Sequence, residues 1–155
     1  MSREDGQTQS ASMEVLAPLM MERLAVGQSV RFTPKGTSML PMLRHGKDTV
    51  MLSPLPARLK KYDLPLYQRD NGQYVLHRVI RVGDDYTCMG DNQFVPEPGL
   101  RHDQMIGLVT AFSRKGKEYT VQHPGYRLYC RVWYHTRHAR HLFRRGIAFI
   151  RRRLP

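Results

Sequence analysis

The sequence has no apolar run long enough to cross a lipid bilayer, which requires about 18–20 consecutive apolar residues. Its best run near the start, residues 15–21, is interrupted by Pro18 and closed by Glu22 and Arg23. That run is also too short and too charged for the apolar core of a secretory signal peptide. We therefore expect no transmembrane segment in this chain.

Cysteine is scarce, with only Cys88 and Cys130 in the chain. Two thiols without metal-type spacing do not make a zinc site, and we expect neither a metal nor another cofactor. One disulfide is conceivable, but reduced and buried thiols are the default expectation. Such thiols fit a cytosol-facing compartment.

Acidic residues are missing from the last part of the chain. The 155 residues include 25 Lys and Arg against 13 Asp and Glu, a net charge of +12. Residues 126–155 contain nine arginines and no acidic residue, so this segment carries most of the excess. A basic excess this local indicates a surface that meets phosphates, anionic lipid or an acidic partner.

The pattern along the chain predicts one domain with an appendage at each end. We interpret residues 1–12 as a flexible tail and residues 13–122 as the domain with an N-terminal helix. The helix spans about 13–26, with Ser12 as N-cap and Gly27 as stop, although Pro18 leaves a start near Ala17 open. Residues 123–155 form a basic C-terminal segment.

Short β-rich stretches separated by turn signals fill the middle of the chain. Their number and spacing predict a mainly β fold, a coiled β-sheet or barrel. We expect strands at residues 29–33, 49–52, 64–68, 73–82, 86–89, 105–112 and 118–122.

The C-terminal segment predicts a basic amphipathic helix, with Gly146 as a point where it could break. Its apolar residues, among them Trp133, Phe143 and Ile150, recur near helical spacing with arginines between them. One interpretation lays residues 126–155 on an anionic membrane surface. The alternative packs the apolar face on the β body and leaves the arginines in solvent.

Three short motifs could carry chemistry. The first is 36–41, Gly-Thr-Ser-Met-Leu-Pro, where Gly36 and Pro41 favour an irregular loop that exposes Ser38 beside free amides. The second is His77-Arg78 in the strongest strand, and the third is the turn 90–92, Gly-Asp-Asn. Each motif alone is typical of ordinary loops, half-buried histidines and turns.

Taken in order, the motifs resemble the signal peptidase I and repressor-peptidase superfamily of serine peptidases. Two further blocks match, Gly46-x-Asp48-x-Val50 and the segment 106–109, so that the resemblance covers about residues 28–112. Members of this superfamily use either Lys or His as base. The matching position here is His77, so the chain resembles the His type, found in archaeal and endoplasmic-reticulum signal peptidases, without their usual transmembrane anchor.

The resemblance implies Ser38 as nucleophile, His77 as general base and Asp91 as the acid that orients it. Asp48 is the alternative partner of His77. A His base near its unperturbed pKa of ~6.5 predicts an acidic limb of activity near pH 6–7.

The same resemblance suggests roles for the remaining site residues. The backbone N–H of Ser38 is the expected oxyanion donor, and Gly36 stands where some relatives place a helping hydroxyl, so a second donor must come from elsewhere. Met39 is expected to pack beneath the site, and Asp48 and Arg78 to hold the scaffold.

The function expected from this resemblance is a serine endopeptidase that cleaves a leader or signal-type peptide after small residues. Its partners would be a peptide or precursor protein and an anionic membrane surface. We expect it in the cytoplasm or peripherally at the cytoplasmic membrane. One alternative is a non-catalytic peptide-binding module. Another is a nucleic-acid-binding protein on the repressor scaffold, although no helix-turn-helix precedes residue 28.

Overall fold

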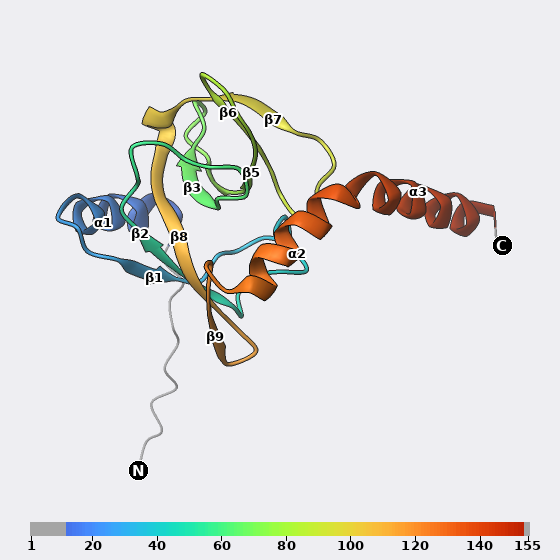
Figure 1. The fold of residues 1–155 in the computed structure, drawn as a ribbon, viewed down its shortest axis with the longest axis horizontal. Helices are drawn as coiled ribbons and strands as arrows, with labels where there is room; N and C mark the ends of the chain where they lie inside the picture. The colour runs from blue at the N-terminus through green and yellow to red at the C-terminus, as the bar shows by residue number, and fades with distance from the viewer. Residues whose placement is uncertain (1–11, 154–155) are drawn as a thin grey trace, which may run out of the picture.

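The computed structural model describes residues 12–153, so all but the last residue of the predicted tail over 1–12 lies outside it. The described chain forms two antiparallel sheets, one N-terminal helix and two C-terminal helices (Figure 1). The helices are α1 (Met13–Ala25), the 3₁₀ helix η1 (His102–Gln104), α2 (Pro124–His135) and α3 (Arg137–Arg153). The strands are β1 (Val30–Phe32), β2 (Thr49–Ser53), β3 (Pro65–Gln68), β4 (Tyr74–Leu76), β5 (Arg78–Val82), β6 (Tyr86–Met89), β7 (Glu97–Leu100), β8 (Met105–Arg114) and β9 (Lys117–Thr120).

The larger sheet has the order β1-β2-β8-β3-β4, with β9 also paired to β8, and the smaller has the order β5-β6-β7. The predicted mainly β character holds for the body, but the fold is mixed α/β and no barrel closes among the described residues. The larger sheet stays open because β1 and β4 end its pairing order. The larger core cluster packs α1 and α2 against the larger sheet, around Leu52, Leu66 and Val109. A second cluster joins the two sheets through Tyr67 and Cys88.

The strand predicted over 73–82 is two strands. β4 pairs with β3 in the larger sheet, whereas β5 pairs with β6 in the smaller one. His77 is the residue between them, so the chain passes from one sheet to the other at this histidine. Strand β7 was not predicted, because its Pro98 and Gly99 are residues that strands usually avoid.

The N-terminal helix is confirmed as α1, which includes Pro18, so the alternative start near Ala17 is wrong. Ser12 occupies the N-cap position, but its side chain makes no capping hydrogen bond. Leu24 of α1 packs close to β8 at Gly107, where an added Cβ would lie 3.0 Å from Leu24 Cδ1 and 2.7 Å from Leu52 Cγ.

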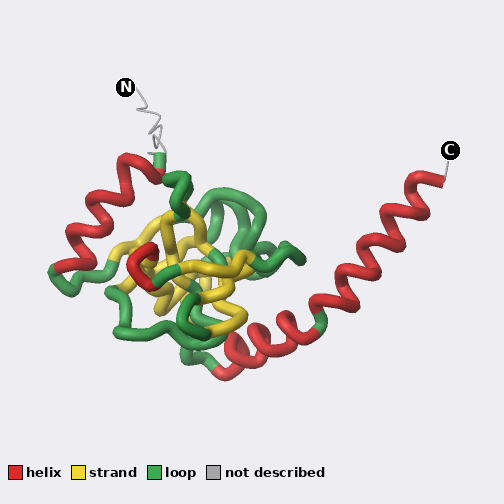
Figure 2. The backbone as a smooth tube through the Cα atoms, turned by 90° about the horizontal axis from the view of Figure 1, so that it is seen from above, coloured by secondary structure: helices red, strands yellow, loops and turns green. Residues whose placement is uncertain are grey.

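The C-terminal segment is two helices that meet at Thr136, and Gly146 lies inside α3 rather than at a break. Helix α2 packs on the body through buried Tyr126 and Cys130, whereas α3 extends away from it (Figures 1 and 2). No helix between residues 12 and 153 combines the length and apolarity that a membrane span needs. Both cysteines are buried free thiols, as predicted.

Candidate active site

Ser38 lies in the loop between β1 and β2, half-buried at the edge of a pocket of about 400 Å³. Gly36 enters this loop with φ +98°, in the left-handed region that glycine adopts at little cost. Its N–H donates to Nδ1 of His45 at 2.6 Å, which fixes the start of the loop. The irregular loop predicted around Ser38 is therefore present.

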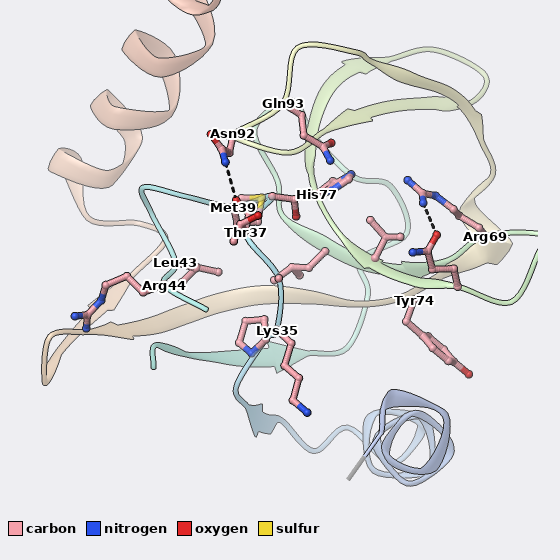
Figure 3. Close-up of a pocket in the computed structure, with 16 residues that line it drawn as sticks. Lys35, Thr37, Met39, Leu43, Arg44, Arg69, Tyr74, His77, Asn92 and Gln93 are labelled. Atoms are coloured by element: carbon pink, nitrogen blue, oxygen red, sulfur yellow. Dashed lines mark hydrogen bonds between the residues drawn. The ribbon is translucent and has the colours of Figure 1, made fainter. Parts of the chain in front are cut away.

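The 90–92 turn holds the Ser38 loop from the other side. The backbone N–H of Asn92 donates to the Ser38 carbonyl at 2.8 Å, and Asn92 Nδ2 donates to the Thr37 carbonyl at 3.1 Å (Figure 3). A Cβ on Gly90 would stand 2.6 Å from the Ser38 carbonyl oxygen, so this close approach requires glycine. The turn therefore positions the backbone of the Ser38 loop through both the main chain and the side chain of Asn92.

His77, the second predicted site residue, lies at the same pocket. It is only 4% exposed, yet it lines the pocket together with Ser38. Among residues 12–153 we find no hydrogen bond between the Ser38 hydroxyl and His77. The pocket that both residues line is therefore what relates Ser38 to His77 in this structure.

Tyr67 and Glu97 lie on the Nδ1 side of the His77 ring. Its Nδ1 lies 3.3 Å from the Tyr67 hydroxyl and 4.0 Å from Glu97 Oε2. The Tyr67 hydroxyl is 2.7 Å from Glu97 Oε2, and Arg69 donates to both oxygens of that carboxylate, each at 2.7 Å. Because a carboxylate only accepts, Tyr67 donates its proton to Glu97 and accepts from Nδ1–H of His77. This arrangement leaves Nε2 of a neutral His77 as the proton acceptor.

The pKa values in this cluster favour a neutral histidine beside an ionised glutamate. Burial lowers the pKa of His77 to about 4, an effect that Glu97 opposes and Arg69 reinforces. Hydrogen bonds from Arg69 hold the pKa of Glu97 below its usual value. The pKa near 6.5 expected from the sequence is therefore lowered, because the histidine is buried where β4 passes into β5.

Asp91, the predicted acid, pairs with Arg78 instead of His77. Two hydrogen bonds of 2.8 Å join the Arg78 guanidinium to the Asp91 carboxylate, and the Tyr129 hydroxyl donates to the same carboxylate at 2.8 Å. Arg78 also donates to the Tyr62 carbonyl and the Tyr126 hydroxyl. The pair is fully buried, so Asp91 anchors the 90–92 turn to β5 and α2.

Asp48, the alternative partner of His77, pairs with Arg44 instead. Its carboxylate accepts hydrogen bonds from the side chain and backbone of Arg44, which lower its pKa to about 2. Asp48 and Arg78 therefore both form ion pairs within the fold, and Met39 is buried at the pocket wall. Sequence reasoning missed Tyr67 and Glu97, the latter because it lies on the unpredicted strand β7.

Two groups could stabilise negative charge at the pocket. No backbone carbonyl in the described chain accepts from the N–H of Ser38. The Gln93 side chain extends over the pocket toward His77 (Figure 3), and its Oε1 accepts from the Gly90 N–H at 3.3 Å. With Oε1 held there, Nε2 is the end of the amide that can donate to a bound group.

The pocket is bordered by a sheet edge. Strand β4 ends the order of the larger sheet, and its three residues and the flanking Gln73 and His77 line the pocket. The segment 34–38 lines it as well. An extended peptide could therefore pair with β4 and pass Ser38.

Comparison with known proteins adds no assignment: no protein-family model matches the chain, and no curated protein matches it significantly. Among residues 12–153, no group of three or more His, Cys, Asp or Glu side chains is placed to hold a metal ion.

Proposed function

We propose that this protein is a serine endopeptidase with Ser38 as nucleophile and His77 as general base. The observation that carries the proposal is that Ser38 and His77, from distant segments, line one pocket at the edge of β4. The motif resemblance to His-type signal peptidases supports the same pair. Tyr67 and Glu97 are positioning residues, in place of Asp91.

In the proposed mechanism, Ser38 Oγ attacks the scissile carbonyl carbon and its proton passes to Nε2 of His77. The imidazolium that forms is stabilised through Tyr67 by the negative charge of Glu97. The Ser38 N–H, with Gln93 Nε2 as the second donor, stabilises the tetrahedral oxyanion. His77 then protonates the leaving amine, and water, deprotonated by His77, hydrolyses the acyl-enzyme ester and regenerates Ser38.

The proposed substrate is an extended peptide that adds a strand to β4. Free backbone groups at a sheet edge supply hydrogen bonds that do not depend on sequence, and side-chain pockets then supply specificity. By resemblance to signal peptidases, we expect cleavage after small residues in a leader or signal-type peptide.

A library of peptides with varied sequences tests this proposal and does not require the natural substrate. Library peptides are incubated with the wild-type chain and with Ser38→Ala, and new termini are identified by mass spectrometry. We expect cleavage sites with small residues before the cut in the wild-type sample alone. Identical product sets in both samples would contradict the proposal, and tight peptide binding without new termini would identify a non-catalytic module.

A further inference from the structure

Helix α3 presents a continuous apolar half to solvent. With about 3.6 residues per turn, Ala139, Phe143, Ile147 and Ile150 fall on one side of the helix, beside Leu142. Phe143 is 70% exposed, Leu142 67% and Ile150 57%, so the body leaves most of this side in solvent. The alternative in which the basic segment packs its apolar face on the body applies to α2 alone.

The opposite half of α3 is cationic. Eight of its nine arginines and histidines, all those before residue 153, fall on that side at about 3.6 residues per turn, and α3 contains no acidic residue. They are Arg137, His138, Arg140, His141, Arg144, Arg145, Arg151 and Arg152. A helix with an apolar half and a strongly basic half is the form that lies in the plane of a membrane interface and attracts anionic lipid.

The apolar half is continuous with a groove beside the Ser38 loop. This groove, of about 770 Å³, runs between α3 and the body, and Phe143 and Ile147 line it opposite Leu40 and Pro41. Arg144 Nη2 donates to Asn92 Oδ1 at 2.8 Å, which joins α3 to the turn that holds Ser38. A surface bound by α3 would therefore lie close to the candidate active site.

We infer that α3 is an in-plane anchor for an anionic lipid bilayer, and that it holds the Ser38 pocket at the membrane surface. This inference goes beyond the proposed peptidase activity and does not depend on it. A nucleic acid would complement the arginines, but it would leave the apolar half uncovered. The bilayer complements both halves, because its headgroups are anionic and its acyl region is apolar.

Flotation of the full chain with lipid vesicles tests the inference. Vesicles of phosphatidylcholine alone are compared with vesicles that also contain phosphatidylglycerol. We expect binding to the anionic vesicles, weakened by added salt, and at least tenfold weaker binding by the double variant Phe143→Glu/Ile147→Glu. Ser38→Ala should bind like the wild type, which separates this test from that of the peptidase activity.

The matched control is Val15→Glu/Leu19→Glu, which adds the same charges to two exposed apolar residues of α1, 61% and 58% exposed. It should bind anionic vesicles like the wild type. Circular dichroism establishes that each variant is folded. Equal loss of binding in both double variants would overturn the inference, because net charge alone would then account for the effect.

Two further outcomes would also overturn it. The first is absence of vesicle binding by the wild type, with tight binding to a DNA or RNA duplex that Phe143→Glu/Ile147→Glu retains. The second is a wild type that forms a dimer and does not bind vesicles, while Phe143→Glu/Ile147→Glu is monomeric. A second copy of the chain would then cover the apolar half.

Discussion

At the scale of single residues, burial determines how His77 can act. It is neutral at pH 7 and has Tyr67 on Nδ1, so it can accept a proton at Nε2 without first losing one. Its conjugate acid is destabilised by desolvation, which Glu97 partly offsets. If His77 is the base that we propose, it should stay unprotonated, and so able to accept a proton, at lower pH than a solvated histidine.

This burial predicts the acidic limb of the pH profile. A protonated His77 cannot accept the Ser38 proton, so activity should be lost as pH falls through its folded-state pKa of about 4. We expect kcat/KM for a cleaved peptide to stay near its maximum at pH 6 and to decline only below about pH 5. A limb centred at pH 6–7 would contradict the buried geometry of His77.

Glu97 should affect catalysis through His77 without touching substrate. Glu97→Gln removes the negative charge that steadies the imidazolium, so we expect kcat to fall about tenfold or more, equivalent to about 1.4 kcal/mol, with KM little changed. The acidic limb should also move to lower pH, because Glu97 raises the pKa of His77. Steady-state kinetics across pH measure both effects.

The control is Glu118→Gln, which removes the partner of Arg31 on the exposed surface outside the pocket. It should leave kcat and the pH profile unchanged. If Glu97→Gln behaves like this control, Glu97 does not position His77.

At the scale of elements, local sequence and long-range pairing contribute differently. Helix α1 and strands such as β2 and β6 were predicted because their own residues carry the signal. The division of 73–82 was not predictable, because each half is defined by a partner strand distant in sequence, β3 or β6. Likewise the helix boundary at Thr136 separates a packed helix from an exposed one, which periodicity alone does not distinguish.

The 90–92 turn should tolerate no side chain at its first position. Gly90→Ala places a Cβ against the Ser38 carbonyl, so we expect the Ser38 loop to shift and peptide cleavage to fall at least tenfold. In Gly83→Ala the nearest atom would be 3.7 Å away, an ordinary contact, and activity should be retained. Equal activities for the two variants would show that the turn does not position Ser38.

The Arg78–Asp91 pair should stabilise the junction of β5, the 90–92 turn and α2. Asp91→Ala leaves the buried Arg78 guanidinium without its carboxylate, so we expect a loss of about 3–5 kcal/mol in the free energy of unfolding. Urea denaturation measures this loss, and Asp103→Ala, on an exposed carboxylate, should change it little. A small effect for Asp91→Ala would mean that Asp91 has another role.

At the scale of the whole molecule, the candidate site joins segments that the sequence separates. The ordered motifs predicted Ser38 and His77, and the fold brings both to one pocket. The partner of His77 was not predictable, because Glu97 comes from β7 and reaches Nδ1 through Tyr67 of β3. The carboxylate nearer in the motif order, Asp91, is instead required by a buried arginine that packs α2 against the body.

The initial rate of peptide cleavage by four chains tests the central claim most directly. These are the wild type, Ser38→Ala, His77→Gln and the control Ser53→Ala, whose hydroxyl bonds Ser29 and Thr110 outside the pocket. We predict that Ser38→Ala and His77→Gln cleave about 10³-fold or more slowly than the wild type, and that Ser53→Ala cleaves at the wild-type rate. Wild-type rates in Ser38→Ala or His77→Gln would contradict the claim.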